Sequence, residues 1–232
     1  MFVRLLCLAV VVLLPRLAFA EEPWTPPGAC RADTWNDVEQ WREWNSHTPA
    51  DNVTRWAEEK PRYANNRDVW RWLDRLYIAI SGGKLLTLAD CAFGDDLHFY
   101  LYERYDEAGE FHVVRTYFYE DHLYALVMRR TGKIYTIPGQ PIWSPDRTRF
   151  AYSICDLMNG REELAVMSMS NDRPNLEAKS DLPCTLGNCK LIWENNTMVS
   201  ATCEDPQGSG GKRQVVRLTR KGDGWTSSTS SR

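Results

Sequence analysis

The sequence lacks an excess of positive charge, is poor in histidine, and does not contain several short motifs that mark known enzyme chemistries. Lys and Arg number 28 against 31 Asp and Glu, and only four of the 232 residues are histidine. Nucleic acid is therefore not an expected partner, because nucleic-acid-binding domains carry a basic patch. The motifs G-x-S-x-G, H-E-x-x-H, G-x-G-x-x-G and the Walker A loop are absent. We predict no cofactor and no catalytic residue, and we favour a non-enzymatic role over an enzymatic one.

Long apolar runs are also absent after the first twenty residues, whereas a membrane-spanning helix needs about eighteen or more. The first twenty follow the three-part pattern of a signal peptide. Arg4 gives a basic start, residues 5–14 are apolar, and Ala18-Phe19-Ala20 fits a cleavage site. We expect cleavage after Ala20 and export of the product, residues 21–232, to the periplasm or the extracellular space, with no transmembrane segment left.

Export would place the cysteines in an oxidising compartment. Loss of Cys7 leaves an even number of cysteines, which predicts three disulfides: Cys30, Cys91, Cys155, Cys184, Cys189 and Cys203. Sequence alone does not select among the fifteen connectivities. The Gly187-Asn188 turn favours a local Cys184–Cys189 bridge. Elimination, together with the grouping of the chain into segments, then leaves Cys30–Cys91 and Cys155–Cys203. Zinc is the alternative, but only one close cysteine pair exists and no histidine follows His122, so no metal is predicted.

Two hydrophobic periods divide the chain after the signal peptide. Residues 21–83 are expected to form a Trp-rich helical cap, in which residues 67–80 show helical spacing and Ser81-Gly82-Gly83 ends the helix. From Lys84 the period changes to two, with turn signals about every ten residues, which is typical of antiparallel β structure. Residues 84–226 would be this β domain and residues 227–232 a polar tail. The predicted strands are 85–89, 97–105, 111–119, 123–129, 134–137, 150–154, 163–169, 191–194, 198–203, 214–219 and 224–228.

The expected fold class is therefore mainly β with an N-terminal α-helical segment (α+β). The sheets would form an antiparallel meander or sandwich, or partial propeller-like sheets, capped by the Trp-rich helices.

One segment, residues 132–153, carries a repeat-like motif. It reads Gly132-Lys-Ile-Tyr-Thr-Ile-Pro-Gly-Gln-Pro-Ile-Trp-Ser-Pro-Asp146, followed by Arg149-Phe-Ala-Tyr-Ser153. This segment resembles a blade repeat of periplasmic β-propeller proteins of the Tol type, whose signature is W-S-P-D-G-x-x-I-A-F; Arg147 stands at the family's glycine. The resemblance implies that Trp143 packs between sheets and that residues 144–146 form a turn. In that family the motif marks folding repeats and carries no catalytic residue, so a scaffold or binding role is implied.

Histidines and acids gather in one predicted strand region: His98, His112 and His122, with Asp95, Asp96, Glu120 and Asp121. A turn that pairs Asp106 with Glu110 sets His112 opposite Arg104 and Phe99 opposite Tyr117, and it places Arg115 diagonal to Glu103, an expected ion pair. His98 and His112 are then about 20 Å apart, at ~3.4 Å per residue, so a shared metal site is not favoured. A secreted hydrolase that uses carboxylates of the 95–121 region stays an alternative.

Aromatic residues are more informative, because they populate both faces of the predicted meander. Trp70 and Trp72 are two apart, so they cannot both lie at the centre of a helix's buried stripe. Either one aromatic face is core and helices cover the other, or exposed aromatics mark a binding surface. The candidate binding residues are Trp70, Trp72, Tyr100, Tyr102, Tyr117 and Tyr119. We predict an exported, non-enzymatic binding or scaffold protein whose partner is an envelope protein or another envelope component. A carrier of a small apolar ligand is a further alternative.

Overall fold

The computed structural model describes residues 50–72, 74–91, 98–118, 121–156, 161–184, 189–203 and 213–231. These residues form helix α2 (Ala50–Tyr63) and four antiparallel sheets. Sheet 1 contains β1 (Val69–Trp72), β2 (Arg75–Ile80) and β3 (Lys84–Ala89), and sheet 2 contains β4 (Phe99–Asp106), β5 (Phe111–Tyr117), β6 (His122–Met128) and β7 (Ile134–Ile137). Sheet 3 contains β8 (Ile142–Trp143), β9 (Arg149–Asp156), β10 (Arg161–Ser170) and β11 (Arg173–Asp181), and sheet 4 contains β12 (Cys189–Asn195), β13 (Met198–Cys203), β14 (Gln214–Lys221) and β15 (Gly224–Ser231).

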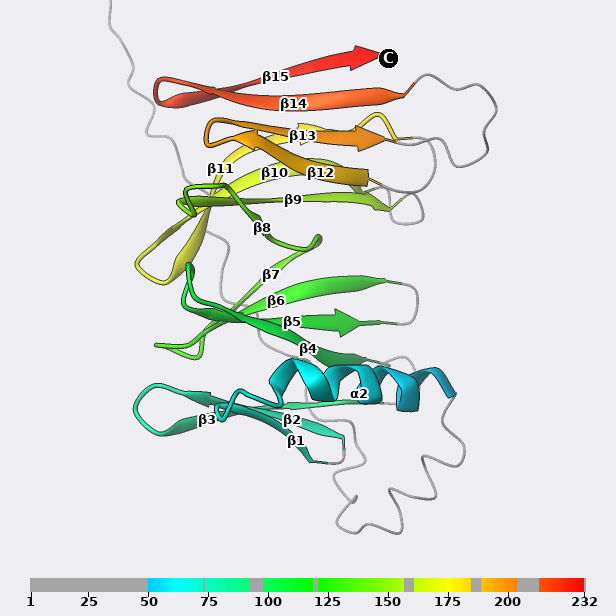
Figure 1. Cartoon of the computed structure of the whole chain (residues 1–232), viewed down its shortest axis with the longest axis vertical. Coiled ribbons are helices and arrows are strands. Elements are labelled where there is room, and N and C mark those ends of the chain that lie inside the picture. Colours follow the sequence, from blue (N-terminus) through cyan, green and yellow to red (C-terminus); the bar gives the residue numbers. More distant parts are fainter. Residues whose placement is uncertain are drawn as a thin grey trace, which may run out of the picture.

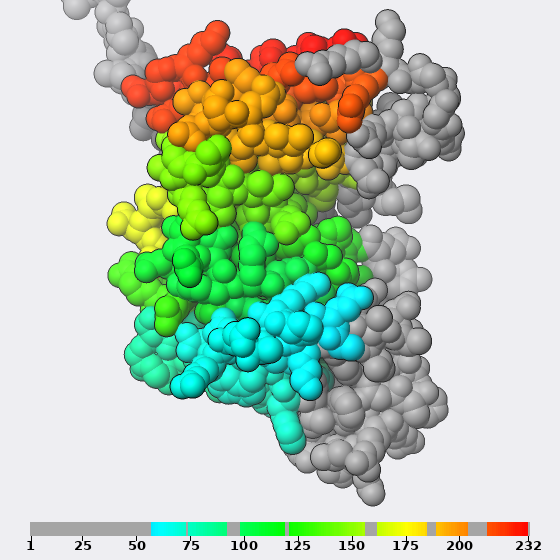
Figure 2. Space-filling model, in the orientation of Figure 1, coloured from blue at the N-terminus to red at the C-terminus, as the bar shows by residue number. Residues whose placement is uncertain are grey.

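Each sheet is a meander, in which every strand pairs with the next strand in the chain. The sheets stack in chain order, from sheet 1 at one end to sheet 4 at the other, and α2 lies across sheet 1 and β4 (Figure 1). The space-filling view shows the same order of colours along the surface (Figure 2). The expected fold class, mainly β with antiparallel meanders and a helical segment, is confirmed.

Three hydrophobic clusters hold the stack together, one between each pair of successive sheets. Strand β6 contributes side chains to two of these clusters. Ala125 and Val127 belong to the cluster between sheets 1 and 2, whereas Leu126 and Met128 belong to the cluster between sheets 2 and 3. Successive strand residues point to opposite faces, so a sheet buried on both faces needs apolar residues at every position. None of the three clusters, which cover only the described residues, joins sheet 4 back to sheet 1.

The segment with the propeller-like motif links sheets 2 and 3. The ring of Trp143 packs against Phe111 of β5 and Phe150 of β9, with ring-centroid distances of 6.1 and 5.3 Å. Ser144 Oγ donates to Asp146 Oδ1 at 2.6 Å and thereby fixes the turn before β9. Arg147, at the family's glycine, has a φ of 55°, in the left-handed region that favours glycine. The family resemblance itself stays a prediction.

Residues 67–80 were predicted to be helical, and this prediction is wrong: they contain β1 and β2, paired with Val69 opposite Ile78. The apolar positions fit both periods, since Val69, Leu76 and Ile80 are spaced as on a helix while Leu76, Ile78 and Ile80 alternate. In β2 the buried residues are the alternating ones, Leu76, Ile78 and Ile80. Residues 81–83 are consequently a hairpin turn between β2 and β3. Among the described residues, sheet structure begins at Val69 rather than Lys84.

Three further expectations need correction. Residues 227–231 are not a tail but belong to β15, which pairs along its whole length with β14. Strands β8 and β11 were not predicted. Phe99 lies opposite Tyr117 as expected, but Asp106 pairs with Phe111 instead of Glu110, and a bulge between Tyr102 and Arg104 restores the register.

The longer turn changes the neighbours of one histidine, but the bulge leaves the expected ion pair in place. His112 lies opposite Tyr105, not Arg104, because the β4–β5 turn includes Glu110 and is one residue longer than expected. Arg115 Nη2 lies 2.5 Å from Glu103 Oε1, so the predicted Arg115–Glu103 ion pair is confirmed.

Two disulfides join Cys155 to Cys189 and Cys184 to Cys203. The expected Cys184–Cys189 and Cys155–Cys203 pairs are therefore wrong. Stacking decides the connectivity: Cys155 lies on β9 and Cys189 on β12, strands that lie against each other across sheets 3 and 4. Cys91 is also disulfide-bonded. Cys30 lies outside the described residues, so the Cys30–Cys91 pair stays a prediction. Disulfides of this kind are typical of an oxidising, exported environment.

Candidate binding surface on the first sheet

The six aromatic residues singled out from the sequence do not form one surface. Tyr100 and Tyr102 are buried in the core between sheets 1 and 2, so neither lies on an exposed aromatic surface. Tyr117 is half-buried at the end of β5, where its hydroxyl accepts a hydrogen bond of 2.9 Å from Arg115. Tyr119 lies outside the described residues. Only Trp70 and Trp72, both on β1, share an exposed face.

That face is the outer side of sheet 1, at one end of the stack. Trp70 lies opposite Tyr77, and Leu85 lies opposite Ala79, on the side away from the core. Trp70, Trp72 and Leu85 are 40, 62 and 50% exposed, and the ring of Trp70 stacks on Tyr77 at 5.4 Å. We call Trp70, Trp72, Tyr77 and Leu85 the end face. The sequence reasoning missed Tyr77 and Leu85, although alternation from Arg75 to Ile80 would have indicated the first of them.

The opposite end of the stack has a different chemistry. The outer side of sheet 4 carries the ion pair between Arg217 Nε and Glu194 Oε1, 2.9 Å apart, and hydroxyl residues such as Thr202. Ile192 is its exposed large apolar side chain among the described residues. A terminal sheet of this fold can therefore present a polar surface to water. The aromatic character of the end face is a property of sheet 1 and not a general result of the architecture.

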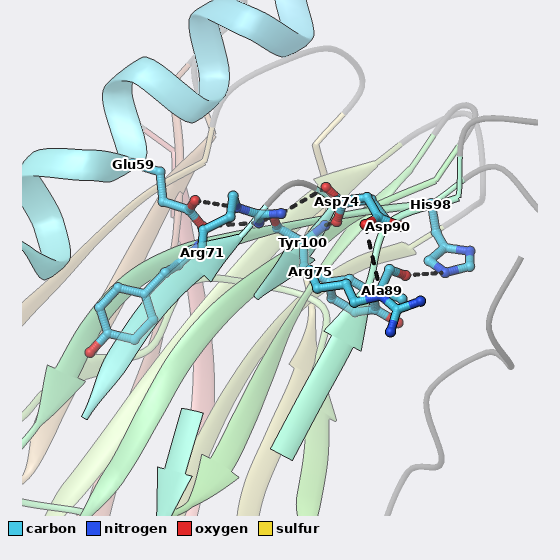
Figure 3. A network of polar contacts seen from close by, with 9 residues as sticks. Glu59, Arg71, Asp74, Arg75, Ala89, Asp90, His98 and Tyr100 are labelled. Atoms are coloured by element: carbon cyan, nitrogen blue, oxygen red, sulfur yellow. Dashed lines mark hydrogen bonds and ion pairs between the residues drawn. The ribbon is translucent and has the colours of Figure 1, made fainter. Parts of the chain in front are cut away.

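A buried polar network fixes the strand that carries the two exposed tryptophans (Figure 3). Arg71 lies between them in sequence and therefore points inward. Its Nε donates to Glu59 Oε2 at 2.6 Å, and its Nη1 donates to Asp90 Oδ2 at 2.9 Å. The backbone amide groups of Tyr102 and Tyr100 donate to Glu59 Oε1 at 2.6 Å and to Asp90 Oδ1 at 2.9 Å. The network thus ties α2, sheet 1 and β4 together behind the end face.

The charges in this network are unevenly matched, because one guanidinium meets two carboxyl groups. Burial raises the pKa of Asp90 to about 7, although Arg71 and the amide of Tyr100 oppose the rise. Burial disfavours the charged guanidinium, but Asp90 and Glu59 together raise the pKa of Arg71 above its usual range. Arg71 is therefore charged at every accessible pH, whereas Asp90 titrates near neutrality.

The histidines do not form a common site among the described residues. His112 is buried, and its Nδ1 lies 3.2 Å from the hydroxyl of Tyr102, which also accepts a hydrogen bond from Asn66. Burial lowers the pKa of His112 to about 4, so its ring is neutral at neutral pH. His122 is exposed and lies five residues along β6 from the partner of His112, about 17 Å away at ~3.4 Å per residue. His98 Nε2 instead lies 3.1 Å from the carbonyl oxygen of Ala89.

The acids proposed for a hydrolase lie mostly outside the described residues. Three of them, Asp95, Asp96 and Glu120, lie outside the described residues. Asp121 is described and is half-buried in the turn before β6. Its backbone carbonyl accepts a hydrogen bond from the amide of Phe118. The hydrolase alternative therefore stays untested.

No family model, curated protein or solved structure matches the chain. Within the described ranges, no helix has both the length and the apolar character to cross a bilayer. Function is therefore inferred from the sequence and the geometry of this chain.

Proposed function

We propose that this chain is a non-enzymatic, exported binding protein, and that the end face of sheet 1 contacts an envelope protein. The observation that carries the proposal is the exposure of Trp70, Trp72 and Leu85 on one side of a regular sheet whose other side is core. Tryptophan and tyrosine are enriched among the residues that dominate binding energy in protein interfaces. Clustered apolar side chains of this size on a soluble protein are typical of an interaction surface.

The buried network behind the end face favours binding, because it holds the surface in one conformation. Arg71 is anchored to Glu59 and Asp90, so the backbone of β1 on either side of it is fixed. The Trp70 ring is held further by its stacking on Tyr77. A surface that is ordered before binding loses less conformational entropy when a partner arrives.

The proposed compartment is supported by other parts of the chain. The signal-peptide pattern of residues 1–20 supports export, and the two disulfides support an oxidising destination. The resemblance of residues 132–153 to a propeller repeat supports a scaffold with a binding role. An envelope protein is the partner class that fits both destination and surface.

The small apolar ligand carrier has less support. A pocket of about 350 Å³ lies between the β4–β5 turn and the β10–β11 turn. Glu107, Glu110 and Asp172 border it. Carrier sites for apolar ligands are lined mainly by hydrophobic and aromatic side chains, so this pocket does not favour that function.

The proposal is tested by quantitative affinity capture from envelope extracts of the source cells. The Trp70→Ala/Trp72→Ala double variant is expected to recover at least about tenfold less of a specific partner than the unmodified chain. A decrease of this size corresponds to the loss of one or two interface hot spots. The matched control is Leu176→Ala/Ile192→Ala, which removes two exposed apolar side chains away from the end face. A partner recovered equally well by both variants, or no partner recovered by the unmodified chain, would contradict the proposal.

A further inference from the structure

Four cysteines meet in the core between sheets 3 and 4, although they are spread over 49 positions of the chain. Cys155 comes from β9, Cys184 follows β11, Cys189 begins β12 and Cys203 ends β13. The pairing of β12 with β13 sets Cys189 directly opposite Cys203. The two disulfides therefore lie side by side at one point of the fold.

Their sulfurs are close across the pairs as well as within them. Cys155 Sγ lies 2.7 Å from Cys184 Sγ, and Cys184 Sγ lies 3.6 Å from Cys189 Sγ. Three of the four sulfurs, those of Cys155, Cys184 and Cys189, thus lie within 4.8 Å of one another, and the fourth, that of Cys203, is bonded to the sulfur of Cys184.

Four cysteines gathered at one place in the core match the ligand set of a structural zinc site. Tetrahedral Zn²⁺ with Zn–S bonds of about 2.3 Å requires thiolates about 3.8 Å apart. When both disulfides are open, each sulfur is free to rotate about its own Cα–Cβ bond between staggered rotamers, and this rotation is what would bring the thiolates to that spacing. Cys184 and Cys189 also have the C-x₄-C spacing of many zinc sites.

We propose that the reduced form of this protein binds one Zn²⁺ through Cys155, Cys184, Cys189 and Cys203, as an alternative to the two disulfides. Each disulfide accepts two electrons and two protons from a dithiol reductant, which leaves as its own disulfide. Zn²⁺ then displaces the four thiol protons and becomes bound by four thiolates. In either form sheets 3 and 4 stay linked at this point, by covalent bonds or by the metal.

The surroundings suit a closed structural site. Cys184 and Cys203 are buried, and the same cluster contains Leu182, Val199 and Leu218. An apolar shell restricts the access of water to a bound metal. The sequence did not indicate this site, because Cys155 and Cys203 are single cysteines that only the stacking of sheets 3 and 4 brings next to Cys184 and Cys189. The proposal is independent of the end face, which lies at the other end of the stack.

The experiment uses residues 21–232, purified with its disulfides, reduced anaerobically with a phosphine and titrated with Co²⁺ and then Zn²⁺. We expect one Co²⁺ per chain, with the sulfur-to-cobalt charge-transfer absorption of tetrahedral thiolate coordination, displaced by one Zn²⁺. X-ray absorption should give four sulfur neighbours at about 2.3 Å. The chain with its disulfides intact should bind neither metal in this way.

Variants separate the cluster from other ligands. Cys184→Ser and Cys203→Ser should each lower the affinity of the reduced chain for Zn²⁺ by more than about tenfold, because each removes one of four thiolates. Cys91→Ser, outside the cluster, is the matched control and should bind Zn²⁺ like the unmodified chain. Equal affinity in Cys184→Ser and Cys91→Ser would overturn the proposal, as would a cobalt spectrum without thiolate absorption.

Unfolding of the reduced chain is followed in the same samples. Zn²⁺ should raise the Tm of the reduced chain, because binding to the folded state alone stabilises it. The Tm of the disulfide-bonded chain should not change. A reduced chain that stays unfolded in the presence of Zn²⁺ would also overturn the proposal.

Discussion

Arg71 Nε lies 2.6 Å from Glu59 Oε2, and this buried ion pair joins helix α2 to the strand that carries Trp70 and Trp72. The guanidinium also contacts Asp90, so three charged groups from different elements are enclosed in one place. Buried charges are costly unless they are paired and hydrogen-bonded. Each carboxyl group here meets both the guanidinium and a backbone amide of β4. The network therefore binds sheet 1 to the remainder of the fold.

Removal of the central cation should destabilise the protein strongly. We expect Arg71→Met to lower the free energy of unfolding by about 3–5 kcal/mol, because two carboxyl groups are left buried without a counter-charge. Arg75→Met is the matched control on the neighbouring strand: the Arg75 side chain is 40% exposed and its Nε lies 3.8 Å from Asp74 Oδ1, so its loss should cost less than ~1 kcal/mol. Urea unfolding measures both values. Similar losses for the two variants would show that the network is not what holds sheet 1.

The pH dependence of stability should contain a contribution from Asp90 in a defined direction. Burial raises the pKa of Asp90 from 3.8 to about 7, so the folded chain holds a proton that the unfolded chain releases. The contribution is fully present below pH 3.8 and is lost as the pH rises through about 7. Asp90→Asn should remove it, so the difference in unfolding free energy between variant and unmodified chain should change between pH 4 and 8. A difference that stays constant over this range would contradict the assignment.

Two buried tyrosines in the same core should respond differently to loss of their hydroxyls. The Tyr102 hydroxyl accepts a hydrogen bond from Asn66 and contacts His112, so Tyr102→Phe should cost about 1–3 kcal/mol. The Tyr100 hydroxyl is buried with no hydrogen-bond partner among the described residues. Tyr100→Phe should therefore change stability by less than ~0.5 kcal/mol or increase it. Thermal unfolding of the two variants compares them directly, and the reverse order would rule out this account of the core.

The disulfide connectivity can be read by peptide mapping without reduction. We expect peptides that join Cys155 to Cys189 and Cys184 to Cys203. Cleavage after Leu186 is needed, because trypsin leaves Cys184 and Cys189 on one peptide. Recovery of an intact Cys184–Cys189 loop would show that the local turn, and not the stacking of sheets, decides the pairing.

The sequence predicted the strands that have a clear period of two and strong turn signals. Ile134–Ile137 and Met198–Cys203 are found with the predicted bounds. Strand β11, Arg173–Asp181, was missed because it contains few apolar residues, as an edge strand can. The β1–β2 hairpin was missed because its apolar residues also fit a helix. Local pattern therefore predicts a strand where the pattern is unambiguous, and tertiary packing decides elsewhere.

The candidate sites depend on packing that no local pattern contains. Trp72 is exposed because sheet 1 lies at the end of the stack. The residues around Trp72 in the sequence do not indicate the position of the sheet in the stack. Tyr100 and Trp70 are both aromatic residues, and the sequence does not distinguish their roles. Tyr100 is buried because sheet 2 packs against a sheet on each side, whereas Trp70 lies on the outer face of sheet 1. The four-cysteine cluster likewise exists only after β9, β12 and β13 are stacked.

Site-specific photo-crosslinking in the envelope tests the central claim most directly. A photoreactive amino acid is placed at position 72, on the end face, or at position 192, at the other end of the stack, and the protein is irradiated in its own cells. The account predicts a discrete protein adduct from position 72 that is absent from position 192. The same adducts from both positions, or none from position 72 in a folded protein, would contradict it.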